Sequence, residues 1–199
     1  AMYWAGAALA AARLGDGAAA KERFAQAEYY LAQEREADAR AGLGAWLANC
    51  LLLAGELRAA REKAEAALPD AARSLRFSTV FELETILAEL ALVEGREEEF
   101  AFFVRDAAIL LGEPILREPR VESRFRYFAW LHLERQLDSR GEARGTPAAL
   151  AGAGLDAADA ERQIARAKEL LEFELSQLRD DACRERMLEC SVWRRILEA

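Results

Sequence analysis

Three glycines, Gly15, Gly55 and Gly95, recur at intervals of forty residues in this chain of 199 residues. Each glycine lies between two stretches of helical hydrophobic periodicity, and an acidic residue follows it within two positions. Glycine adopts the left-handed conformation that ends a helix at little cost, and an acidic residue favours the start of the next helix. The pattern therefore predicts a repeated unit of helix, tight turn and helix.

Small and apolar residues recur at fixed offsets from these glycines. Two antiparallel helices joined by a short turn approach closely only when small residues lie at their contact. A single helix pair buries too little apolar surface to be stable, so the pairs must stack. The recurring sets are Ala8, Ala48 and Ala88; Ala11, Leu51 and Ala91; Ala20, Ala60 and Phe100; Phe24, Ala64 and Val104; and Ala27, Ala67 and Ala107.

The composition agrees with an all-α fold. The chain has 44 Ala and 29 Leu, whereas Val, Ile and Thr total only 13, which argues against a β-rich structure. Its 35 acidic and 27 basic residues give a net charge of -8, so a nucleic-acid partner is not expected. The longest uncharged stretch, 41–55, is shorter than the roughly 20 residues that span a bilayer, so no membrane contact is expected. A signal peptide is likewise not expected.

The helical pattern divides the chain into four units and a terminal helix, in a single domain. Pro69, Pro114 and Pro119 are expected between helices. Residues 138–156 lack apolar periodicity and are predicted to form a loop. Because the helical pattern starts at the first residues, the chain is expected to be part of a longer protein. The predicted helices are 2–13, 18–35, 38–54, 57–68, 77–94, 97–111, 120–137, 157–179 and 182–198, in units 1–37, 38–76, 77–116 and 117–180, with 182–198 as a cap.

The first unit resembles the tetratricopeptide repeat. The resemblance implies a right-handed α-α superhelix, a solenoid of about four helix pairs plus a C-terminal capping helix. The repeat of this chain departs from the family in its period, which is forty residues where about thirty-four is usual. It also has Ala11 where an aromatic residue is usual, and it lacks a proline after Ala27. The longer units look like those in sensory regions of bacterial LuxR-type regulators. The matching residues are Trp4, Ala7, Ala8, Ala11, Gly15, Ala20, Phe24 and Ala27.

The sequence contains no pattern of residues typical of a catalytic, metal or cofactor site. His132 is the only histidine, which excludes the usual Glu-x-x-His pairs of a carboxylate-bridged metal centre, and its neighbours Trp130, Leu131 and Leu133 indicate a helix histidine within a structural environment. The segment 151–154 alternates Ala and Gly but lacks the Lys-Ser or Lys-Thr of a phosphate-binding loop. The three cysteines form no disulfide pattern, which favours a reducing cytoplasm.

Most of the net negative charge lies in residues 81–120, which hold ten acidic residues and four arginines. Glu97, Glu98 and Glu99 open a helix, where the helix dipole explains them. Glu82 and Glu89 are seven residues apart and share one face of their helix. In the family, the first helices line a concave face, whose expected residues here include Ala45, Leu52, Thr85 and Phe125. The candidate partner-binding residues on that face are Arg13, Asn49, Glu82, Glu89, Arg126 and His132.

The family members that bind C-terminal carboxylates carry a lysine where this chain has Ala45, so that clamp is not expected here. The predicted function is a non-catalytic protein or peptide interaction module in the regulatory or scaffolding region of a larger bacterial protein. Glu82 and Glu89 favour a partner with a basic segment. An effector-sensing domain of a transcriptional regulator, with a small ligand in the concave face, is the alternative. A homodimer through the terminal helix is a further possibility if its apolar side is uncovered.

Overall fold

The computed structural model describes residues 1–111, 119–138, 160–178, 181–188 and 191–199. The chain divides into two compact units, Ala1–Arg96 and Glu97–Ala199. All regular elements in the described residues are α-helices, which confirms the predicted all-α helical-repeat class. The boundary between the units lies at the turn of the predicted repeat 77–116.

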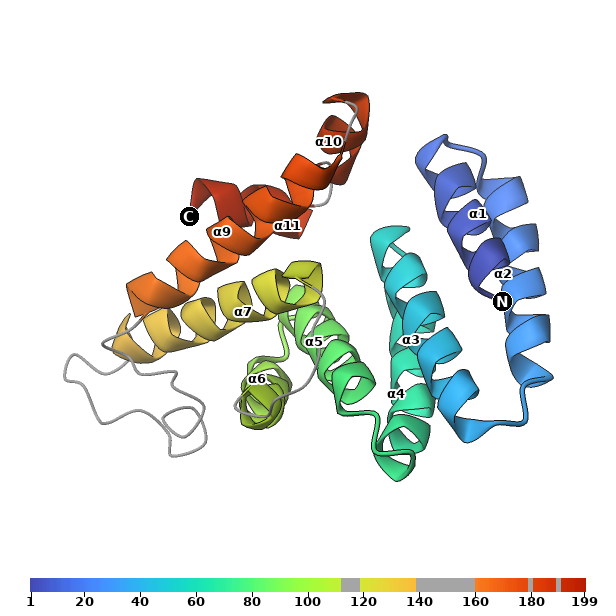
Figure 1. Ribbon diagram of the computed structural model, residues 1–199, viewed down its shortest axis with the longest axis horizontal. Helices are drawn as coiled ribbons and strands as arrows, with labels where there is room; N and C mark the ends of the chain where they lie inside the picture. The colour runs from blue at the N-terminus through green and yellow to red at the C-terminus, as the bar shows by residue number, and fades with distance from the viewer. Residues whose placement is uncertain (112–118, 139–159, 179–180, 189–190) are drawn as a thin grey trace. The chain divides into compact units, whose positions relative to one another are not determined.

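The first unit is a sequential stack of helices, shown side by side in Figure 1. Helix α1 packs on α2, and α3 packs on α4. The first helices also contact one another, α1 with α3 and α3 with α5, while α2 contacts α3 and α4 contacts α5. Each second helix therefore lies against the first helix of the next pair. The helices are α1 (Met2–Arg13), α2 (Gly17–Ala32), α3 (Ala37–Leu53), α4 (Leu57–Arg73) and α5 (Phe77–Val93).

The three predicted glycine turns share one hydrogen-bonding pattern. Gly15, Gly55 and Gly95 have φ values of 79°, 81° and 71°. The amide after each glycine donates to the carbonyl five residues earlier, as Asp16 does to Ala11 at 3.0 Å. This is the left-handed helix end for which glycine is best suited.

Leu75 makes the same turn without glycine. Its φ is 53°, and the amide of Arg76 donates to the carbonyl of Ala71 at 2.9 Å. The turn joins α4 to α5, and the Leu75 side chain is exposed. The sequence did not indicate this helix end, because leucine is not a left-handed signal.

The recurring small residues form the contacts between helices. All fifteen positions of the five recurring sets are buried, and none is more than 8% exposed. Eleven of the fifteen are alanine, a residue that allows neighbouring helices to approach closely. The forty-residue pattern therefore marks the core.

The prediction that Pro69 lies between helices is wrong. Helix α4 continues through Pro69 to Arg73. Proline removes one backbone hydrogen bond and crowds the preceding turn. The helix continues because Asp70 and Ala71, which follow Pro69, are buried and the Asp70 carboxylate is bound by Arg40 of α3 and by Arg73.

The second unit is built around the contact of α7 with α9. The Ser123 hydroxyl on α7 donates to the Ala167 carbonyl on α9 at 2.7 Å. Pro119 is the first residue of α7, where its missing N–H costs nothing. Pro114 and most of the predicted loop, 139–156, lie outside the described residues. The helices are α6 (Glu97–Leu111), α7 (Pro119–Asp138), α9 (Ala160–Gln177), α10 (Asp181–Leu188) and α11 (Ser191–Glu198).

The predicted single terminal helix 182–198 is wrong, because the structure has two helices, α10 and α11. Helix α11 contacts α7 and α9, and its Val192, Trp193 and Ile196 are buried. The apolar side of α11 packs within its own unit. This side is therefore covered in the single chain.

Candidate functional site

The first helices of the stack share one face, which we call the first-helix face. On each helix it consists of residues at the same offsets from the turn glycine, spaced by three and four positions so that they lie on one side. This side differs from that of Ala8, Ala48 and Ala88, which are buried between helices. The first-helix face comprises Met2, Gly6, Leu9 and Arg13 on α1; Gly42, Trp46, Asn49 and Leu53 on α3; and Glu82, Ile86, Glu89 and Val93 on α5.

Four of the six predicted binding residues belong to this face. Arg13 is exposed in the last turn of α1, and Glu82 is half-buried near the start of α5. Asn49 and Glu89 are buried. They occupy the same repeat position, forty residues apart, on helices that contact each other. Arg13 and Glu82 are therefore the charged groups that a partner reaches first.

Trp46 also lies on the first-helix face. It is half-buried, and its indole N–H donates to the Met2 carbonyl at 3.3 Å. The bond joins α3 to the beginning of α1. Part of the flat apolar ring of Trp46 therefore remains exposed beside the polar residues of the first-helix face.

Three residues expected on the concave face are instead core residues. Ala45, Leu52 and Thr85 are buried, and the Thr85 hydroxyl donates to the Phe81 carbonyl of its own helix at 2.7 Å. Their offsets turn them about 100° away from the first-helix face, toward the neighbouring helix. Phe125 of α7 is likewise buried in the second unit.

The other two predicted residues, Arg126 and His132, lie on α7 in the second unit. The Arg126 guanidinium donates to Glu122 at 2.8 Å and to Gln163 of α9 at 2.6 Å. His132 is buried, and its ring meets the Phe100 ring edge to face at 6.0 Å. Both side chains thus have structural contacts inside their own unit.

Ion pairs fix the helices that carry the first-helix face. Asp70 of α4 binds Arg40 of α3 and Arg73, and these hydrogen bonds, with that of Arg40 the stronger, hold the pKa of Asp70 below its usual value. Arg76, before α5, donates to Asp38 of α3 at 2.8 Å and lowers the pKa of that carboxyl. Helices α3, α4 and α5 are thereby held in register.

The described residues contain no group of three or more His, Cys, Asp or Glu side chains placed to hold a metal ion. Among the described helices, none has both the length and the apolar character needed to cross a membrane. No family model, curated protein or solved structure matches the chain.

Proposed function

We propose that the chain is an interaction module that binds a protein or peptide segment on the first-helix face without covalent chemistry. The module would act in the cytoplasm, within the regulatory or scaffolding region of a larger bacterial protein. The tetratricopeptide-like pattern of the first repeat, residues 1–37, supports this proposal, because stacked helix pairs present extended surfaces to partners.

The proposal rests on one observation: α1 contacts α3 and α3 contacts α5, so the same repeat positions of the three first helices follow one another in a row. Asn49 and Glu89 are equivalent residues on α3 and α5, and Glu82 lies two turns before Glu89 on the same side of α5. Asn49 and Glu89 are buried, whereas Glu82 is half-buried, so Glu82 is the carboxylate of this row that a partner can reach. A carboxylate in this position favours a segment that carries basic side chains.

The half-buried Trp46 ring adds an apolar contact beside these polar groups. An indole face attracts arginine and lysine as well as apolar side chains. A partner segment that alternates basic and apolar residues therefore fits this surface. Ala45, the position of a clamp lysine in the family, is buried, so a terminal carboxylate is not the expected anchor.

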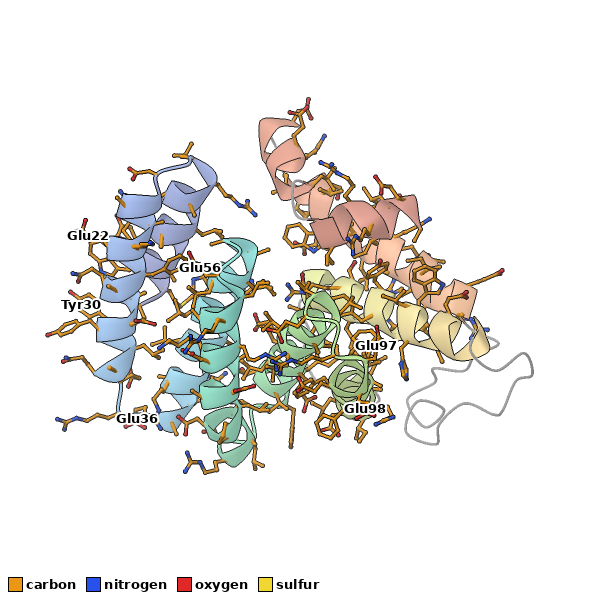
Figure 2. All side chains as sticks on the ribbon, turned by 180° about the vertical axis from the view of Figure 1, so that it is seen from behind. Glu22, Tyr30, Glu36, Glu56, Glu97 and Glu98 are labelled. Carbon is orange, nitrogen blue, oxygen red and sulfur yellow. The ribbon has the colours of Figure 1, made fainter. Side chains whose placement is uncertain are left out.

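Fluorescence anisotropy with a labelled peptide of about four Arg-Ala-Leu repeats tests this proposal. We expect Glu82→Gln to weaken binding about fivefold or more at low salt. The matched control is Glu22→Gln, because Glu22 is exposed on α2, and Figure 2 shows it with Tyr30 on the outer side of that helix. Glu22→Gln should change the affinity less than about twofold.

A peptide of the same length with Glu in place of Arg is the second control. It should not bind, and raising the salt should weaken binding of the basic peptide, because exposed charges are screened. Equal affinity of wild type and Glu82→Gln for the basic peptide, with both proteins folded by circular dichroism, contradicts the proposal.

A further inference from the structure

Helix α1 carries an exposed apolar stripe, distinct from the first-helix face. We call Tyr3, Ala7, Ala10 and Leu14 the α1 stripe. Tyr3 is 77% and Leu14 is 83% exposed. The spacing of four, three and four residues places all of them on one side of the helix. The buried residues of α1, Ala5, Ala8 and Ala11, lie on another side.

Most of the same repeat positions are covered on the next two first helices. Five of the eight counterparts are buried, among them Leu47, Leu83, Leu87 and Leu90, which have no exposed surface, whereas Leu43 and Ala54 are half-buried and Glu94 is exposed. The α1 stripe differs from its counterparts in exposure but not in apolar character, except at the last position of α5. The counterparts are Leu43, Leu47, Cys50 and Ala54 on α3, and Leu83, Leu87, Leu90 and Glu94 on α5.

The structure shows what covers the counterparts. Helix α4 contacts α5, and Arg61 of α4 reaches Glu94, the last position of the α5 stripe, at 2.7 Å. Helices α1 and α2 both contact α3. In each case the preceding helix pair contacts the helix that carries the counterpart residues.

Basic residues on the second helices also recur at the forty-residue spacing. Lys63 of α4 pairs with Glu28 of the preceding second helix, α2, at 2.9 Å. The residue forty positions before Lys63 is Arg23. Its guanidinium donates to the carbonyl of Ala7, a residue of the α1 stripe, at 3.1 Å. A cation therefore stands at the edge of the stripe, where an acidic residue of a preceding second helix would meet it.

We propose that the α1 stripe is an open repeat interface that binds a further helix pair of the same kind. The added pair packs ahead of α1 in the register in which α1 and α2 pack on α3. It places an acidic residue, at the repeat position of Glu28, opposite Arg23. Ala7 and Ala10 in the middle of the stripe allow the added helix to approach closely. This interface is independent of the first-helix face and of its partner.

A chain with a second copy of residues 1–40 placed ahead of Ala1 tests the proposal. This addition keeps the register, because residue 41 is the repeat equivalent of residue 1. We expect amide hydrogen exchange in the original Met2–Arg13 to slow by about tenfold or more relative to the unextended chain. Unchanged exchange in this helix overturns the proposal.

Two variants make the test specific. Ala10→Glu in the original copy should leave the unextended chain folded, because Ala10 is exposed, and should abolish the added protection in the extended chain. Arg23→Glu in the original copy should reduce the protection, and Glu28→Lys in the added copy should restore it. Protection that is insensitive to both variants contradicts the proposed register.

Light scattering of the unextended chain decides between this proposal and self-association. We expect a monomer. A dimer that Ala10→Glu converts to a monomer shows that a second copy occupies the stripe, and this overturns the proposal.

Discussion

Gly44 of α3 lies so close to Ala67 of α4 that a methyl group on Gly44 would be 2.7 Å from the Ala67 Cβ. Real Cβ atoms do not approach that closely, so the second helix pair requires glycine at this position. Trp4 and Glu84 occupy the equivalent positions of the other two first helices. The local contact between α3 and α4 therefore differs from the other contacts of the repeat.

We expect Gly44→Ala to lower the free energy of unfolding by about 1–3 kcal/mol through overpacking. Gly42→Ala is the matched control, because Gly42 lies on the same helix with open space around its position. It should raise stability by up to about 1 kcal/mol through helix propensity. Urea denaturation measures both changes, and a stabilising Gly44→Ala would show that the helices separate freely.

Leu75→Gly should raise the free energy of unfolding by about 1 kcal/mol, because Leu75 has a left-handed backbone that disfavours a Cβ. Leu14→Gly is the control, since Leu14 is also exposed near a helix end but has a φ of -85°. It should give no gain. Thermal unfolding followed by circular dichroism compares the two, and equal melting temperatures for wild type and Leu75→Gly would contradict the expected strain.

Asp70 should make stability sensitive to acid. Its pKa is lowered in the folded chain by hydrogen bonds from Arg40 and Arg73, so its contribution is fully present above the ordinary value of 3.8 and is lost as the pH falls through the lowered folded value. At neutral pH, Asp70→Asn should cost about 2 kcal/mol. The difference between the two proteins, measured by urea denaturation, should shrink between about pH 5 and pH 2.

Arg73→Ala is the control for the Asp70 experiment. Arg73 binds the same carboxylate but its side chain is 73% exposed, so we expect a loss of at most about 1 kcal/mol. A difference between wild type and Asp70→Asn that does not vary with pH would mean that the Asp70 carboxylate has no linkage to folding.

Phe100 should be essential to the second unit. It is completely buried and contacts the rings of Phe128 and His132, so Phe100→Ala should cost about 3–5 kcal/mol. Phe102→Ala, on the same helix with a half-exposed ring, should cost about 1 kcal/mol or less. Similar losses for the two variants, by chemical denaturation, would show that burial does not distinguish them.

Most of the fold could be predicted from the sequence because helix ends and close contacts have local chemical signatures. Gly15, Gly55 and Gly95 marked turns through their conformational freedom, and the recurring alanines marked helix contacts. The left-handed conformation of Leu75 and the continuation of α4 through Pro69 were not predicted, because neither residue type favours the conformation it has here. In α4, the burial of Asp70 and Ala71 outweighed the effect of proline.

Helical periodicity placed Arg13, Asn49, Glu82 and Glu89 on one face, since that relation depends only on the spacing of residues along a helix. It did not predict that Asn49 and Glu89 are buried whereas Arg13 is exposed. Burial depends on how far each helix lies from its neighbours, and this distance is set by particular contacts such as that of Gly44 with Ala67.

The equal spacing of Gly15, Gly55 and Gly95 has a consequence for how genes of this kind change length. A recombination event that joins one glycine turn directly to another deletes or adds forty codons and leaves every contact position in phase. An insertion inside a helix rotates the following residues away from their partners unless its length is close to a whole number of helical turns. Whole units are therefore the natural increments of growth and loss for this array.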